Sequence, residues 1–263
     1  MKLRGKIVVV TGASQGIGAA TARELAARGA VVALVARNAD ALDARVDAIR
    51  RSGGRAAAFP ADLSDPARAT DLADRVRARL GAADVVVNNA GAGRWLFLDE
   101  TPVDELTGMI ALPFTAALHV TRAFLPGLRA RPEAAVVVVN SPVSRLPIPG
   151  ATAYAASRYA LRGLTEALRL DLRGTGVRVT EVIPGKVSSE YFANNPGAEE
   201  RIPAIARLIP TATPEQVATR IGEALARDRR TVVFPWQLKA FDLLGRVAPA
   251  MTGYLTWRTG THR

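Results

Sequence analysis

A serine, a tyrosine and an arginine in the second half of the sequence have types and spacings that suit proton transfer. Tyr154 and Arg158 are four residues apart, so a helix would place them on one face, one turn from each other. Ser141 lies thirteen residues before Tyr154. A free phenol titrates near ~10, too high for an efficient base at neutral pH, and a fixed cation lowers such a pKa by ~1–3. We therefore expect these three residues to form an acid/base site.

A glycine-rich stretch, TGASQGIG at 11–18, follows an apolar run and precedes a helical pattern. Gly12 allows a tight turn, while Gly16 and Gly18 let the backbone approach a pyrophosphate and let the helix pack on a sheet. The first turn of that helix offers unpaired N–H groups and the positive end of a dipole to the phosphates. This strand–turn–helix context predicts a dinucleotide site.

The residues after the second apolar run favour one dinucleotide over the other. Sites that prefer NAD usually place an acid there to bind the ribose hydroxyls. The sequence reads VARN instead, and Arg37 stands where a 2′-phosphate would lie. A guanidinium donates several hydrogen bonds to a phosphate, although Arg37 could also serve only as a solvated loop residue. We predict NADP(H), with NAD(H) as the alternative.

The elements that must position these residues follow from the apolar pattern. Continuous β-branched runs typical of buried parallel strands alternate with longer helical patterns. The predicted strands are 6–10, 30–35, 56–60, 84–88, 135–140, 177–183 and 231–234. The predicted helices are 16–28, 38–51, 65–80, 102–130, 154–173 and 214–226. The alternation predicts an α/β fold, a single-domain Rossmann-type doubly wound parallel sheet of about seven strands with helices on both faces.

Residues 1–263 show no linker, so we expect one dinucleotide-binding catalytic domain. The segment 188–213 is rich in Pro, Asn and Glu and is interpreted as a lid that sets substrate specificity. Its apolar residues predict a lipophilic substrate rather than a sugar: Tyr191, Phe192, Ile202, Ile205, Leu208 and Ile209. Lys186, just before it, is either solvated or a cation near the substrate.

Composition excludes several classes of function. The chain has no cysteine and two histidines, so no thiolate or histidine metal site is expected. The net charge is +11, but the arginines are scattered and not interleaved with aromatics, so we expect no nucleic-acid partner. The N-terminus runs into a strand without a signal-peptide core, and no run of ~18 apolar residues occurs, so we expect a cytoplasmic protein. The tail 236–263 could pack on its own domain, on another subunit, or as an interfacial helix on a membrane.

The ordered motifs together resemble the short-chain dehydrogenase/reductase family over roughly residues 5–190. They are the glycine-rich loop at 11–18, NNAG at 88–91, the Ser–Tyr spacing, and PG at 184–185. The resemblance implies that Ser141 orients the substrate oxygen and that Tyr154 moves the proton. It also implies a homodimer or homotetramer packed through the helices 102–130 and 154–173.

The resemblance extends to the cofactor contacts. Asp62 and Leu63 would flank the adenine, Asn89 and Gly91 would line the crevice, and Val187 would meet the carboxamide. The full predicted cofactor set is Gly12, Ser14, Gln15, Gly16, Ile17, Gly18, Arg37, Asp62, Leu63, Asn89, Gly91, Tyr154, Arg158 and Val187.

Two positions depart from the family pattern. The family has Lys four residues after the Tyr, where this sequence has Arg158, and Asn in the long helix, where the alignment puts Pro113. Arginine supplies the charge and can hydrogen-bond the ribose, but it cannot release a proton. Proline removes a helical N–H and frees the carbonyl of Met109, so we hypothesise that a kink there retains a relay water.

Two functions remain open from the sequence. The first is an NADP(H)-dependent oxidoreductase that interconverts a carbonyl and an alcohol, with Ser141, Tyr154 and Arg158 as its catalytic residues. The second is a dinucleotide-binding sensor or scaffold with weakened turnover, which Arg158 and Pro113 motivate. The retained Ser–Tyr pair favours the enzyme.

Overall fold

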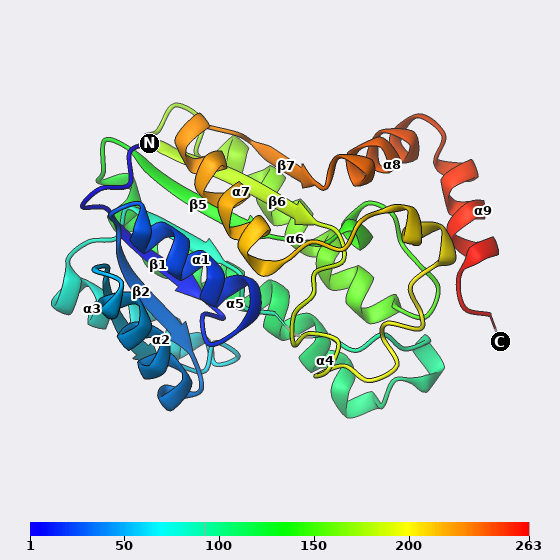
Figure 1. The fold of residues 1–263 in the computed structure, drawn as a ribbon, viewed down its shortest axis with the longest axis horizontal. Coiled ribbons are helices and arrows are strands. Elements are labelled where there is room, and N and C mark those ends of the chain that lie inside the picture. Colours follow the sequence, from blue (N-terminus) through cyan, green and yellow to red (C-terminus); the bar gives the residue numbers. More distant parts are fainter. Residues whose placement is uncertain (92, 263) are drawn as a thin grey trace.

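Seven strands form one parallel sheet in the computed structural model, which describes residues 1–91 and 93–262 (Figure 1). The strands are β1 (Ile7–Thr11), β2 (Val31–Ala36), β3 (Arg55–Pro60), β4 (Val85–Asn88), β5 (Ala134–Val139), β6 (Val177–Pro184) and β7 (Thr231–Phe234). Their order is β3-β2-β1-β4-β5-β6-β7, so the direction of winding reverses between β1 and β4. Ligands of such sheets bind at the carboxyl ends of the strands beside this reversal.

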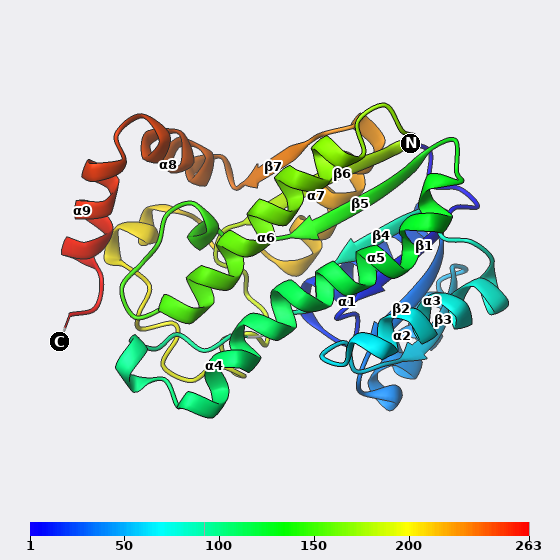
Figure 2. The ribbon, with the colours of Figure 1, turned by 180° about the vertical axis from the view of Figure 1, so that it is seen from behind.

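Helices cover both faces of the sheet, as the alternating pattern predicted (Figures 1 and 2). One face carries α1 (Gly16–Ala27), α2 (Ala39–Arg51) and α7 (Pro214–Arg227). The other carries α3 (Pro66–Leu80), α5 (Ala116–Arg129) and α6 (Thr152–Asp171). Successive strand residues point to opposite faces, so Val8 and Val10 join the first core while Ile7 and Val9 join the second. The predicted fold class is confirmed.

The long helix predicted over 102–130 is wrong as a single α-helix. The chain forms α4 (Val103–Ile110), then a π-helical turn, η2 (Ala111–Thr115), and then α5. Pro113 lies inside this turn. Proline has no N–H for the α-helical ladder, and a π turn is a local solution that keeps the helix continuous. By length and composition alone Val103–Arg129 could cross a membrane, but it packs against α3, α6 and the strands of the sheet.

The tail folds into two helices that the sequence pattern did not specify. They are α8 (Trp236–Val247) and α9 (Pro249–Thr259), and they lie at the end of the molecule toward which the strands point (Figures 1 and 2). Three short 3-10 turns lie at the same end: η1 (Leu98–Glu100), η3 (Pro142–Ser144) and η4 (Ala204–Leu208). This end therefore carries most of the irregular chain, above the carboxyl edge of the sheet.

Candidate active site

A cavity of about 1390 Å³ lies at the carboxyl edge of the sheet and reaches from the β2 end to the tail. It gathers residues that are up to 244 positions apart in the sequence, from Gly12 to Thr256. The sequence-predicted residues that line it are Gly12, Ser14, Gln15, Gly16, Ile17, Arg37, Asp62, Leu63, Asn89, Gly91, Ser141, Tyr154, Arg158 and Val187. Gly18 does not line it. Parallel strands bring these segments together because all seven end at one edge.

The glycine-rich loop has the geometry that a phosphate cradle needs. Gly12 and Gly16 have φ angles of +65° and +53°, which favour glycine. A Cβ on Gly18 would lie 2.1 Å from the Gly12 carbonyl oxygen, so Gly18 lets α1 pack on its own loop. Asn89 Nδ2 donates to the carbonyl of Thr11 at 3.1 Å and so joins the ends of β1 and β4. The first N–H groups of α1 thus face the cavity, and the loop fits a pyrophosphate.

Two arginines line the cavity beyond the end of β2. Arg37 follows the strand, and the side chain of Asn38 caps α2 by accepting from the Ala41 N–H at 3.0 Å. Arg45, two turns into α2, also lines the cavity, and its Nε donates to the Ser14 carbonyl at 3.1 Å. Sequence reasoning missed Arg45, because Arg37 lies before α2 and helical spacing therefore does not link the two residues.

The acid at this end, Asp62, is held in its ionised form. The Ser64 N–H and hydroxyl both donate to its carboxylate, at 3.0 and 2.8 Å. These hydrogen bonds lower the pKa of Asp62, and the positive charge of Arg37 adds to the effect. Asp62 is therefore engaged with the turn after β3, and the arginines give this end of the cavity a surplus of positive charge.

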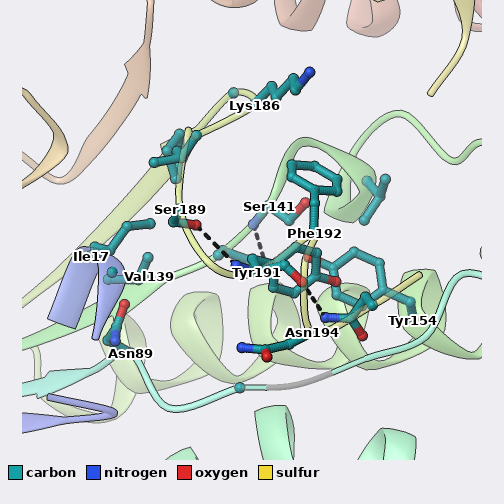
Figure 3. Close-up of a pocket in the computed structure, with 18 of the residues that line it drawn as sticks. Ile17, Asn89, Val139, Ser141, Tyr154, Lys186, Ser189, Tyr191, Phe192 and Asn194 are labelled. Atoms are coloured by element: carbon teal, nitrogen blue, oxygen red, sulfur yellow. Dashed lines mark hydrogen bonds between the residues drawn. The ribbon is translucent and has the colours of Figure 1, made fainter. Parts of the chain in front are cut away.

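Tyr154 lies on α6 with its ring packed between aromatic neighbours. Its ring centroid is 5.7 Å from that of Trp95 and 6.4 Å from that of Tyr191. A Cβ on Gly93 would lie 2.4 Å from its Cδ2, so only glycine lets the loop after β4 pack on this ring. The residue is 5% exposed, yet it lines the cavity (Figure 3). Tyr154 is therefore shielded from bulk solvent and borders the cavity.

Arg158 lies one turn after Tyr154, and its guanidinium carbon is 4.8 Å from the tyrosine ring centroid. This is a cation–π contact. Arg158 is 7% exposed, and its Nη1 donates to the Val139 carbonyl at 3.4 Å. Its Nε is buried and, among the described residues, has no hydrogen-bond partner. Arg158 lines the cavity, and the guanidinium N–H groups on that side would suit the hydroxyls of a bound ribose.

Ser141 lies one residue after the Asn140 that follows β5, in a loop held by short-range hydrogen bonds. The Ser141 N–H donates to the side-chain oxygen of Asn140 at 2.9 Å, and the Ser144 hydroxyl donates to the Ser141 carbonyl at 2.7 Å. Pro142 starts the 3-10 turn that follows. Figure 3 shows Ser141 in the same part of the cavity as Tyr154, Tyr191 and Phe192. The predicted Ser–Tyr–Arg set is thus brought together.

Tyr191 contributes a second phenol that sequence reasoning treated only as an apolar wall. Its hydroxyl accepts from Trp95 Nε1 at 3.0 Å and donates to the Gly93 carbonyl at 3.1 Å. Burial, with the neighbouring Tyr154 as a further cause, raises the pKa of Tyr191 far above that of an ordinary phenol. Tyr191 therefore stays protonated and fixes the lid to the loop after β4.

A buried charge network, which sequence reasoning missed, supports the Ser141 loop. Glu181 on β6 is fully buried, accepts from Asn140 Nδ2 at 2.8 Å, and pairs with Arg145 at 2.7 Å. Arg145 also pairs with Asp242 on α8 at 3.4 Å. Asn140 Nδ2 in turn donates to the Arg158 carbonyl at 3.2 Å. Through these contacts the tail is tied to the segments that carry Ser141 and Arg158.

The far end of the cavity is apolar and is built by the lid, the Ser141 loop and the tail. The apolar residues that line it include Trp95, Leu146, Ile148, Phe192, Ile202, Ile205, Ile209, Leu238 and Phe241. Leu208, predicted in this wall, is 68% exposed instead, because the short turn η4 directs it outward. Lys186 forms an ion pair with Glu199 and lies 5.6 Å from the ring of Phe192, so its charge is balanced.

Comparison with known proteins gives a consistent picture. A family model described as short chain dehydrogenase matches residues 6–200. The 1-deoxy-11-beta-hydroxypentalenate dehydrogenase of Streptomyces exfoliatus is 36% identical over 239 residues, which are 87% of this chain and 82% of that protein. The chain spans only 16% and 63% of the length of two other curated relatives.

Two solved structures extend the likeness to the fold. A short-chain dehydrogenase/reductase from Burkholderia phymatum, in complex with NAD, has a TM-score of 0.85 at 27% identity and covers 95% of this chain and 96% of its own. An NADPH-bound short-chain oxidoreductase from Pseudomonas aeruginosa, described as containing an atypical catalytic center, has a TM-score of 0.78 at 31% identity over 87% of this chain and 94% of its own.

Proposed function

This chain belongs to the short-chain dehydrogenase/reductase family, and on that premise we propose an NADP(H)-dependent oxidoreductase that interconverts a carbonyl and an alcohol on a small lipophilic substrate. The convergence of Ser141, Tyr154 and Arg158 on the cavity that also holds the glycine-rich loop carries this proposal. The two solved structures of the family described above hold NAD and NADPH, respectively. The finer choices of cofactor and substrate rest on the two ends of the cavity.

The roles of the side chains follow from their positions. A bound nicotinamide dinucleotide supplies or accepts the hydride at the carbon of the substrate. Tyr154 gives a proton to the carbonyl oxygen in reduction and takes it back in oxidation. Ser141 donates a hydrogen bond to the same oxygen and orients it. Arg158 holds positive charge against the Tyr154 ring and, where it lines the cavity, would donate to the ribose hydroxyls.

The proton on Tyr154 must be exchanged without help from a titrating lysine, because a guanidinium does not release protons. We propose that the π turn at Pro113 leaves a carbonyl unpaired, with that of Met109 as the candidate, and that a water on it relays protons. The turn packs against α6, which supports this route. An ordered water between this carbonyl and Arg158 in a crystal structure would support the relay, and a dry turn would refute it.

NADP(H) is favoured by charge at the adenosine end. Arg37 and Arg45 both line the cavity there, and no acid follows β2 where one would bind the ribose hydroxyls of NAD. The lipophilic substrate is favoured by the apolar wall at the other end. We place the protein in the cytoplasm. We also propose a homodimer or homotetramer, since Leu118, Tyr159 and Leu170 leave apolar surface exposed on α5 and α6.

Turnover in a panel of lipophilic ketones with NADPH tests the proposal. We expect Tyr154→Phe to lower kcat by about 10²–10⁴-fold, the usual contribution of a general acid, while NADPH binding, followed by fluorescence, stays within a few-fold of the wild type. If the wild type binds NADPH tightly but reduces no member of the panel, the protein is the dinucleotide-binding sensor or scaffold that Arg158 and Pro113 left open.

A further inference from the structure

The two tail helices expose an apolar face that nothing in the described chain covers. Six large side chains on α8 and α9 are between 46% and 77% exposed: Trp236, Leu243, Val247, Met251, Tyr254 and Trp257. On α8 the positions 236, 243 and 247 recur at helical spacing, so they form one stripe. Large apolar side chains gathered on exposed helices mark interaction sites in soluble chains.

The opposite side of the same helices is buried and lines the active-site cavity. Leu238 and Phe241 on α8 and Thr256 on α9 belong to the cavity wall. Asp242, also on the inner side, is 7% exposed and ion-paired to Arg145. The helices α8 and α9 are thus held in place from within and are apolar on both sides. Figures 1 and 2 place them at the outer edge of the molecule, far from β3.

The charges on this outer face are all positive. Lys239, Arg246 and Arg258 are exposed, and the one acid between residues 236 and 262 is the buried Asp242, which pairs with Arg246 at 2.6 Å. The neighbouring Glu200 meets the tail through its backbone carbonyl, which accepts from Thr261. A second copy of the chain docked face to face would bring these cations together without an opposing carboxylate from the tail.

We propose that the outer face of α8 and α9 binds an anionic phospholipid surface. Tryptophan and tyrosine at the two ends of the stripe suit the boundary between headgroups and acyl chains, and the apolar residues between them suit shallow insertion. Lys239 and Arg258 attract acidic headgroups, which supplies the charge complementarity that a second copy lacks. Because the inner side of the same helices lines the cavity, docking places the apolar end of the site beside the lipid phase.

Flotation of the full-length protein with lipid vesicles tests this without any substrate. We expect it to float with vesicles of phosphatidylcholine mixed with phosphatidylglycerol, to float less with phosphatidylcholine alone, and to be released partly by salt. The variant Leu243→Ser/Val247→Ser/Met251→Ser should lower vesicle binding by about tenfold or more. The control Leu98→Ser, at an exposed apolar position outside the tail and outside the helices proposed to pack between subunits, should bind as the wild type does.

A second variant separates charge from insertion and guards against misfolding. Lys239→Gln/Arg258→Gln leaves the apolar stripe and the Asp242 pairs intact, and it should abolish the preference for phosphatidylglycerol. The proposal is overturned if the wild type stays unbound at every lipid composition, or if the serine variant of the tail floats as well as its control. It is also overturned if that variant dissociates an oligomer in sedimentation while the wild type shows no vesicle binding, because the face is then a subunit interface.

Discussion

At the scale of residues, the proposed site pairs its tyrosine with an arginine where the family resemblance implies a lysine. The Arg158 guanidinium is planar, unlike the ammonium group of a lysine at the same position. It lies over the Tyr154 ring at 4.8 Å and bonds the Val139 carbonyl. A planar cation can stack and donate at once, which an ammonium on a flexible stem does less well. The site is therefore built around the shape of arginine as well as its charge.

Substitution of Arg158 separates these two contributions. We expect Arg158→Lys to lower kcat about three- to tenfold, because it keeps the charge and loses a stacking contact worth roughly 0.5–2 kcal/mol. Arg158→Met, which also removes the charge, should be clearly slower than Arg158→Lys. Steady-state kinetics of the three proteins decide the order. Equal rates for the lysine and methionine variants would show that the charge has no role.

Tyr191 gives a pH prediction at the same scale. Its pKa is raised by burial and by Tyr154, so the folded protein holds this proton more firmly than the unfolded chain does, and stability falls as the pH rises above the ordinary range of a phenol. Between pH 6 and 10 Tyr191 stays neutral. Tyr191→Phe should therefore lower kcat/KM about three- to tenfold through two lost hydrogen bonds, without removing a titration step from the pH–rate profile. A missing step would contradict the assignment.

At the scale of elements, the tail is a wall of the active site and not an appendage. The Arg145–Asp242 pair joins α8 to the loop after β5, and Glu181 anchors the same arginine to the sheet. A buried arginine with two carboxylate partners is costly to disturb, because removing one partner leaves charge uncompensated. The lid is held by contacts spread along it, such as the two hydrogen bonds of the Tyr191 hydroxyl and the Arg201–Glu100 ion pair.

Removal of the Asp242 charge should loosen the tail selectively. Asp242→Asn weakens two charge-assisted contacts, to Arg145 and Arg246, at a cost of about 1–3 kcal/mol. We expect trypsin to cut at Lys239 and Arg246 at least several-fold faster than in the wild type. The exposed Asp104→Asn serves as the matched control and should digest like the wild type. Equal digestion of both variants would show that α8 is held by its apolar contacts alone.

At the scale of the whole molecule, the cavity, the lid and the tail all lie at the carboxyl edge of the sheet. The seven strands end there, the cavity opens there, and both the lid and the tail fold over it (Figure 1). A ligand that spans this edge contacts several segments at once. It therefore stabilises the native state by mass action in proportion to its affinity.

Thermal unfolding measures how much a bound dinucleotide stabilises the native state, and it also reports which dinucleotide is preferred. At about 100 times its Kd, NADPH should contribute about 2.7 kcal/mol and raise Tm by roughly 5–10 °C, whereas NADH at the same concentration should raise it less. Arg37→Ala/Arg45→Ala should remove most of the difference between the two dinucleotides. If NADH stabilises the wild type as much as NADPH does, the two arginines do not select the 2′-phosphate.

Local rules made much of the fold predictable. A continuous β-branched run such as Val8–Val10 is apolar on both sides of the strand, so it is buried in a parallel sheet that helices cover on both faces. Each predicted strand agrees with the structure to within about two residues. The π turn at Pro113 and the helices of the tail were not predictable in the same way. The π turn depends on how the long helix packs against α6. The tail helices depend on their contacts with the cavity wall, which no strand or helix pattern in the sequence specifies.

The sequence by itself determined the parallel α/β fold, the glycine-rich loop, and the pairing of Tyr154 with Arg158 on one helical face, because these depend on neighbours along the chain. Only the tertiary structure brought in Arg45, Tyr191, Glu181 and Asp242, together with an outward Leu208. Their partners lie from 31 to 98 positions away, and no local pattern encodes such distances. The physical reason is that packing of the lid and the tail, rather than periodicity, decides which side chains are buried together.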